Sequence, residues 1–261
     1  VRTLPEGKQI KEGKGYLFKN KSLYCGYFRD DKFEGPGLFI LHEETHDAYF
    51  FGFWVSDHLK GKGLVVHDSG YVYSGEWSDD LQNGYGEETW PDGSIYKGEF
   101  KKGKKCGKGE LIWPNKARYT GDFKEGEFDG NGIFEWQHGN KYEGQWKNNN
   151  LDGRGKFTWA DGMVYEGGYA NGKKDGQGVL TWSNHSRWEG TWKNGKRIGD
   201  GKYFNEANEL VHAGEAVLGV ERTERGGSST ARIGSSSKLS APAVNTFDPN
   251  KKPAAPSPRA A

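Results

Sequence analysis

The sequence has few of the aliphatic residues from which a layered hydrophobic core is built. Hydrophobic residues make up 33% of the chain, and methionine occurs once. The aromatic residues are the exception, with 10 Trp, 13 Tyr and 14 Phe. Because each aromatic ring covers a large area when it is buried, we expect the core of this protein to be built from rings.

Cysteine is scarce, and the sequence has neither long apolar runs nor an excess of one charge. Cys25 and Cys106 could form one disulfide, which is too few for a disulfide-stapled secreted domain and favours a reducing compartment. No apolar run approaches the roughly 20 residues that a helix needs to cross a bilayer. The 37 Lys and Arg nearly balance the 36 Asp and Glu, so no nucleic-acid partner is expected.

Glycine, in contrast, is abundant, and the 41 glycines follow a repeat. The segment YSGEW, which starts at Tyr73, recurs every 23 residues. The later copies are YKGEF, YTGDF, YEGQW, YEGGY and WEGTW, which start at Tyr96, Tyr119, Tyr142, Tyr165 and Trp188. Two earlier copies, FFGFW at Phe50 and YCGYF at Tyr24, bring the number to eight.

A second element, Gly-x-Gly, accompanies each copy, as at Gly84 and Gly86. Within YSGEW, Tyr73, Gly75 and Trp77 fall on one face of a strand by period-two alternation. Turn sequences such as PDG, at Pro91, separate the elements. Each repeat is therefore predicted to be a β-hairpin, in which glycine leaves room for the rings of neighbouring strands to lie across the sheet.

The two elements and their period together resemble the MORN repeat family, from about residue 13 to residue 204. The resemblance implies an all-β fold, a single elongated antiparallel β-meander of repeated hairpins that curls into a groove lined by aromatic rings. Three positions depart from the family pattern. Phe50 and Trp188 replace the first tyrosine of the repeat, and Tyr169 replaces the Trp or Phe that ends it.

The candidate recognition residues are the aromatic rings of the repeats, which are expected to serve partly as core and partly as a groove for a partner. They are Tyr73, Trp77, Trp90, Tyr96, Phe100, Trp113, Tyr119, Phe123, Trp136, Tyr142, Trp146, Trp159, Tyr165, Tyr169, Trp182, Trp188 and Trp192. No group of residues stands apart from the repeat as a catalytic, cofactor-binding or metal site, so no cofactor is expected.

One segment does carry a catalytic motif. Residues 42–46 read HEETH, the His-Glu-x-x-His pattern of zinc metalloproteases. That motif binds zinc only on a helix, where the helical period places both histidines on one face. The interval between corresponding glycines is longer here, from Gly37 to Gly52, than from Gly63 to Gly75. We therefore predict that HEETH lies in a lengthened turn and is not a zinc site.

Two other segments approach the phosphate-binding pattern GxxxxGK[ST]. They are GEFKKGKK, from Gly98, and GTWKNGKR, from Gly190, and neither ends in Ser or Thr. The repeat itself generates the pattern, because Gly, an aromatic residue, two polar residues and Gly-Lys recur in such units. Both segments are predicted to be strands of the sheet rather than phosphate-binding loops.

The ends of the chain differ from the repeats in composition. We expect an N-terminal segment (residues 1–12), an array of about eight repeats (13–204), a degenerate last repeat or cap (205–225) and a Ser/Ala/Pro-rich tail (226–261). A strand is favoured over a helix in the third segment, since Gly214 continues the spacing from Gly190. The tail cannot form a core and is expected to be disordered on its own. Residues 219–261 carry seven Lys or Arg against three Asp or Glu, which suits acidic protein surfaces or anionic lipid.

These features favour a non-enzymatic scaffold that binds other proteins through its aromatic groove and sheet edges. Its partners would be an extended peptide or helix in the groove, an assembly that holds the tail, or a second copy at a sheet edge. The resemblance implies a cytoplasmic setting in a ciliary or cytoskeletal assembly, such as an axonemal radial spoke. The alternative is a peripheral membrane module that binds anionic phospholipid, against which the slight negative charge of residues 1–218 counts.

Overall fold

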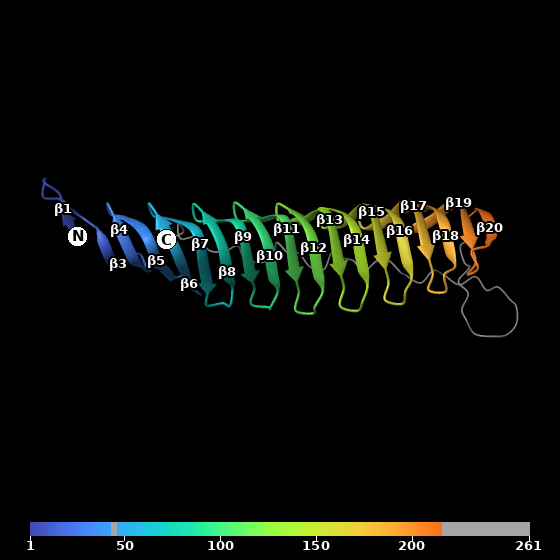
Figure 1. The fold of residues 1–261 in the computed structure, drawn as a ribbon, viewed down its shortest axis with the longest axis horizontal. Helices are drawn as coiled ribbons and strands as arrows, with labels where there is room; N and C mark the ends of the chain where they lie inside the picture. Colours follow the sequence, from blue (N-terminus) through green and yellow to red (C-terminus); the bar gives the residue numbers. More distant parts are fainter. Residues whose placement is uncertain (43–45, 216–261) are drawn as a thin grey trace. The chain divides into compact units, whose positions relative to one another are not determined.

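The computed structural model describes residues 1–42 and 46–215, and every helix or strand in that part of the chain is a β-strand (Figure 1). The prediction of an all-β meander of repeated antiparallel hairpins is therefore confirmed. Within the same residues, no helix has the length and apolarity that crossing a membrane requires.

The chain divides into two compact units, Val1–Glu127 and a second unit that begins at Phe128. The strands of the first unit are β1 (Arg2–Thr3), β2 (Gln9–Ile10), β3 (Gly13–Lys19), β4 (Ser22–Arg29), β5 (Lys32–His42), β6 (Asp47–Val55), β7 (His58–His67), β8 (Val72–Ser78), β9 (Leu81–Thr89), β10 (Ile95–Lys101), β11 (Lys104–Ile112) and β12 (Arg118–Lys124). Strands β1 and β2 pair with each other. From β3 to β12, consecutive strands pair antiparallel within this unit.

The second unit repeats this arrangement. Its strands are β13 (Glu127–Glu135), β14 (Lys141–Lys147), β15 (Asn150–Thr158), β16 (Val164–Ala170), β17 (Lys173–Thr181), β18 (Arg187–Lys193), β19 (Lys196–Phe204) and β20 (Leu210–Glu215). Each again pairs antiparallel with the next. The strand β20 continues the glycine register, because Gly214 lies opposite Gly201.

A row of glycines crosses each unit, because the glycines of neighbouring strands lie directly opposite one another. Gly75, for example, pairs with Gly63 on one side and Gly86 on the other. The ring of Tyr73 lies over this row, where a Cβ on Gly75 or Gly86 would collide with its hydroxyl group. The Tyr73 hydroxyl donates to the backbone oxygen of Glu76 at 3.0 Å. Glycine is thus required because a tyrosine occupies the space that its side chain would fill.

The same tyrosine bond recurs along the chain. Tyr24, Tyr96, Tyr119, Tyr142 and Tyr165 each donate to a backbone oxygen three residues later, at 2.9–3.1 Å. Burial raises the pKa of Tyr24 to about 12, so its hydroxyl remains a hydrogen-bond donor at neutral pH.

We expect Gly86→Ala to lower the free energy of unfolding by about 1–3 kcal/mol, the usual cost of overpacking a core, because the new methyl group collides with the Tyr73 ring. Gly15→Ala is the matched control. A Cβ on Gly15 would meet Phe28 at 3.6 Å, an ordinary contact. Chemical denaturation measures both variants. Equal losses would show that strand propensity, rather than the tyrosine, selects glycine here.

The segments that resemble catalytic motifs belong to strands and hairpin turns where they are described. His42 is the last residue of β5 and pairs with Asp47, the first residue of β6. The prediction that His42 lies in a turn was therefore wrong. The β5–β6 pairing extends the hairpin to this residue, and His42 Nδ1 lies 2.9 Å from Asp47 Oδ2. A zinc-binding helix cannot include a strand residue; the turn predicted for 43–45 lies outside the described residues. The phosphate-loop-like segments were predicted to be strands; they lie in the β10–β11 and β18–β19 hairpins, with residues 102–103 and 194–195 in the tight turns between the strands.

Candidate functional site: an apolar patch on the outer face

The predicted recognition rings form the core of one face of the sheet, which we call the ringed face. Of the seventeen, fifteen are buried, and Trp136 and Trp182 are partly exposed. Most of these tyrosines make edge-to-face contacts with two rings, as Tyr96 does with Phe100 (5.2 Å between centroids) and Phe123 (5.0 Å). Such contacts stabilise the sheet and leave little of these rings accessible to a partner.

A buried polar cluster interrupts the ringed face of the first unit. The carboxylate of Glu88 accepts from the Tyr71 hydroxyl at 2.8 Å and from Gln82 Nε2 at 3.1 Å. Its other oxygen lies 2.8 Å from Lys105 Nζ, and that ammonium group sits over the rings of Trp90 and others. Burial, followed by the neighbouring Glu88, raises the pKa of Tyr71, which keeps its proton and remains a donor. Both carboxylate oxygens of Glu88 thus have a contact within the cluster, two hydrogen bonds at one and the ion pair at the other, and the cluster serves the fold.

The opposite face, which we call the outer face, is apolar in the first strands. One cross-strand row runs Tyr16, Cys25, Leu38, Phe51 and Leu64, from β3 to β7. Tyr16 is 80% exposed, and Phe51 is 41% exposed. Rings this exposed do not contribute to a core, so they are available to a partner.

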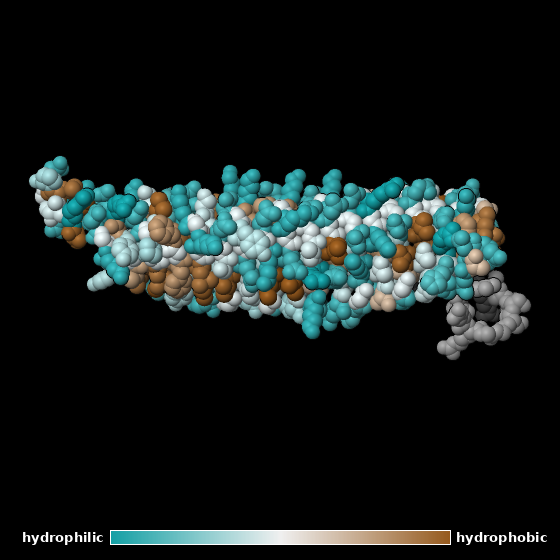
Figure 2. Space-filling model, in the orientation of Figure 1, coloured by the Kyte–Doolittle hydropathy of each residue, from teal (hydrophilic) through white to brown (hydrophobic). Residues whose placement is uncertain are grey.

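Neighbouring positions widen this row into a patch. Phe18 is 68% exposed and Phe53 is 50% exposed, and Pro36 lies opposite Phe53 in the ladder. We define the outer apolar patch as Tyr16, Phe18, Tyr27, Pro36, Leu38, Phe51, Phe53 and Leu64. In Figure 2, hydrophobic side chains gather over the strands of the first unit on the visible face.

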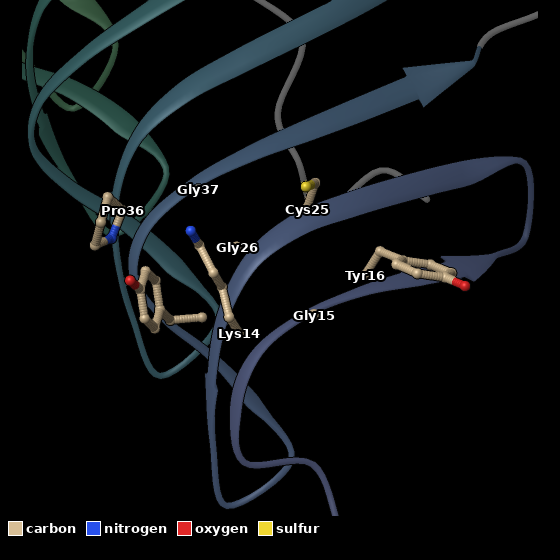
Figure 3. Close-up of a pocket in the computed structure, with 8 residues that line it drawn as sticks. Lys14, Gly15, Tyr16, Cys25, Gly26, Pro36 and Gly37 are labelled. Carbon is tan, nitrogen blue, oxygen red and sulfur yellow. The ribbon is translucent and has the colours of Figure 1, made fainter. Parts of the chain in front are cut away.

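The patch contains a shallow hollow of about 650 Å³. It is lined by Lys14, Gly15, Tyr16, Cys25, Gly26, Tyr27, Pro36 and Gly37. Figure 3 shows Lys14, Cys25 and Pro36 around the backbone of these glycines. Lys14 Nζ lies 5.8 Å from the centroid of the Tyr27 ring, so the hollow combines one cation with aromatic and proline surfaces.

The same row becomes polar in later strands of the first unit. From β8 to β12 its residues are Ser74, Glu87, Lys97, Glu110 and Thr120. The Lys97 ammonium pairs with Glu87 at 3.0 Å, and Arg118 with Glu110 at 3.4 Å. Hairpins with the same backbone thus carry a solvated surface in one place and an apolar one in another. The backbone therefore does not require the apolar residues.

Sequence reasoning missed this patch because it followed the ring positions and treated the positions between them as a solvated face. A signal was present. FFGFW, at Phe50, has rings at Phe51 and Phe53, where later copies have residues such as Ser74 and Glu76.

The residues described by the structure hold no group of three or more His, Cys, Asp or Glu that could bind a metal ion. Cys25 and Cys106 are both free, and Cys25 is exposed within the patch. The two histidines of the protease-like motif face different aspartates. His42 pairs with Asp47, and His46 Nδ1 lies 3.2 Å from Asp68 Oδ1.

Comparisons with solved structures give only remote matches. The TCP domain of SAS-4 from Drosophila melanogaster, solved with a proline-rich motif of Ana2, is 8% identical, and the match covers 59% of this chain and 84% of that chain with a TM-score of 0.38. The TCP10 domain of Danio rerio CPAP is 9% identical, with 82% and 99% covered and a TM-score of 0.39. No curated protein sequence matches.

The family comparison is more specific. The MORN repeat profile matches seven segments, at residues 24–41, 73–95, 96–118, 119–141, 142–164, 165–187 and 188–204. The copy at Phe50 is not among them, although it forms the β6–β7 hairpin. Since the matched segments make up more than half of the chain, this protein belongs to the MORN repeat family.

Proposed function

We propose that this protein is a non-enzymatic scaffold that binds another protein through the outer apolar patch. The observation that carries the proposal is the contrast along one register row, which is apolar from Tyr16 to Leu64 and polar from Ser74 to Thr120. Exposed rings in one part of a repeated surface, where the fold does not need them, indicate a binding role.

The partner that fits is an extended polypeptide with apolar side chains. Within the first unit, β3 pairs only with β4, so its other edge has no strand of that unit beside it. The two most exposed rings of the patch, Tyr16 and Phe18, lie on this edge strand. A segment that adds as a strand to β3 would bond to that edge and cover both rings. A second copy of this chain is the other occupant that a test must separate.

The cellular setting of the proposal rests on family resemblance. It is a cytoplasmic assembly of the cytoskeleton or cilium, such as a radial spoke. We also propose that the tail, residues 226–261, contacts this assembly. These residues lie outside the described part of the chain.

Peripheral membrane binding is the alternative, and one observation favours it. Exposed rings beside Lys14 are the kind of surface that inserts into a bilayer interface above anionic headgroups. Cations near the patch are few, however, and Lys60, on the outer face of β7, pairs with Asp79 at 3.0 Å. A polybasic cluster of the kind that binds anionic lipid is therefore not assembled here.

The double variant Phe18→Ser/Phe53→Ser tests the proposal, because it removes two exposed rings and leaves the buried core nearly unchanged. We expect it to weaken capture of the partner by roughly tenfold or more, as for loss of aromatic anchors at an interface. The melting temperature should change little. Pull-down from cell extract with quantitative mass spectrometry identifies the partner, and titration with that purified partner measures the loss.

The matched control is Tyr85→Ser, which removes a ring that is 59% exposed on β9, outside the patch. It should keep full binding. Light scattering tests self-association, and sedimentation with phosphatidylserine-containing vesicles tests the membrane alternative. Unchanged partner binding by the double variant would overturn the proposal. Loss of vesicle binding without loss of a protein partner would establish the membrane module in its place.

A further inference from the structure

One position in each repeat lies on the ringed face opposite the last ring of the pentapeptide, at the start of the following strand. We call it the inner position. Its occupants in the hairpins whose pairing the structure gives are Phe33, Leu59, Gln82, Lys105, Leu151, Lys174 and Arg197. Two of them are lysines at the same place in repeats that lie three apart in the sequence. Their surroundings differ in one respect.

Lys105 has an internal carboxylate partner. Glu88 Oε2 lies 2.8 Å from its ammonium group, and Gln82 and Tyr71 complete the cluster. The aromatic rings of Trp90 and Tyr96 lie 4.8 and 5.1 Å from the same nitrogen. This position therefore accommodates a carboxylate, an ammonium group and aromatic walls together.

Lys174 is likewise surrounded by aromatic rings, but it differs from Lys105 in its ion pairing. Its nitrogen lies 4.7 Å from the centroid of the Trp159 ring and 4.8 Å from those of Tyr165 and Trp192. Three repeats after Glu88 the sequence places Phe157, which is fully buried. Among the described residues, no carboxylate forms an ion pair with Lys174. Burial, with a smaller contribution from the charge of Arg197, lowers the pKa of Lys174 to about 8.

The neighbouring groups that lack partners are donors. The indole Nε1 of Trp192 is buried and has no acceptor, as is that of Trp77 opposite Gln82, whereas those of Trp54 and Trp146 donate to backbone oxygens at 3.3 and 3.2 Å. Tyr169, which pairs across the hairpin with Lys174, is 4% exposed, and its hydroxyl also has no partner. Other repeats place Trp or Phe at that position, so the hydroxyl is an addition made in this hairpin. A negatively charged acceptor could bond to the Tyr169 hydroxyl and to the ammonium group together, and such charge-assisted bonds are stronger than neutral ones.

We propose that the ringed face of the second unit, between β16 and β19, binds a carboxylate side chain of a peptide, with Lys174 as the cation and Trp159, Tyr165 and Trp192 as walls. The carboxylate pairs with Lys174 where this side chain remains partly exposed, because Phe157 fills the place that Glu88 occupies beside Lys105. Glu88 also argues for a carboxylate rather than a phosphate group, because it shows which anion this arrangement accepts. The site is separate from the outer apolar patch, so either assignment can fail without the other.

Two blocked tripeptides, Leu-Glu-Leu and Leu-Gln-Leu, are probes that differ in one carboxylate. Tryptophan fluorescence follows their binding, since Trp159 and Trp192 line the site. We expect the glutamate peptide to bind the full chain about tenfold more tightly than the glutamine peptide, as for a charge-assisted hydrogen bond. Lys174→Met should abolish the difference, and Lys173→Met, an exposed neighbour, should keep it. Equal or absent binding of both peptides to the wild type, or a preference kept by Lys174→Met, would overturn the proposal. Tighter binding of inorganic phosphate or anionic vesicles would overturn the carboxylate assignment.

A second test needs no ligand. Phe157→Glu places a carboxylate where Glu88 stands in the earlier repeat, beside Lys174. Phe134→Glu places one at the equivalent buried position of the preceding repeat, where the inner residue is the apolar Leu151. We expect Phe157→Glu to retain a clearly higher melting temperature than Phe134→Glu and to lose the peptide preference. Equal melting temperatures, or a Phe157→Glu protein that still prefers the glutamate peptide, would show that Lys174 does not accept a carboxylate.

Discussion

Trp146→Ala should lower the free energy of unfolding by about 3–5 kcal/mol, the range for loss of a core tryptophan. The ring is 3% exposed and packs edge-to-face on Tyr142 at 5.2 Å and on Phe128 at 5.5 Å. Its Nε1 donates to the Gly132 oxygen at 3.2 Å. Removal therefore leaves a cavity between two rings and eliminates this hydrogen bond. Urea denaturation, followed by circular dichroism, gives the free energy.

Trp182→Ala, within the same unit, is the control. This ring is partly exposed, so its removal should lower the free energy of unfolding by less than Trp146→Ala does. A loss under about 1 kcal/mol for Trp146→Ala would mean that the ring packs poorly and is available to a partner. In that case the ringed face, rather than the outer patch, would become the first place to look for binding.

Lys105→Met should cost about 3–5 kcal/mol, the usual penalty for leaving a buried charge without its partner. Glu88 is 5% exposed, and its remaining partners are the neutral groups of Tyr71 and Gln82. The double variant Lys105→Met/Glu88→Leu should recover most of the loss, because apolar residues of similar volume can replace a buried ion pair at little cost. A double-mutant cycle of unfolding free energies measures both terms.

Lys104→Met is the matched control, because Lys104 pairs with Glu125 on the surface, where both side chains are exposed. Its loss should be about 0–1 kcal/mol. A similarly small loss for Lys105→Met would indicate that Glu88 takes up a proton or finds another cation. A double variant as unstable as the single one would show that the cluster is needed for its hydrogen bonds rather than for its charge balance.

Local pattern was sufficient to predict the fold, since the glycine row and the rings are set by neighbours in the sequence. Tyr73, Gly75 and Trp77 share a face by alternation, and the opposite glycines follow from a constant period. The same reasoning misplaced His42, because the extent of a hairpin depends on how many pairs the two strands keep rather than on the interval between glycines.

The sequence by itself determined the hairpins, their register and the ringed core of this MORN repeat protein, because a repeat makes each local preference agree with the next. Only the tertiary structure decided which rings remain exposed and which charges are paired. Lys105 and Lys174 occupy the same position in the repeat, yet one meets Glu88 and the other lies among rings. The outer patch likewise depends on Tyr16, Cys25, Leu38, Phe51 and Leu64 lying side by side. The physical reason is that burial and charge pairing depend on contacts across strands, which the residues of any single repeat do not contain.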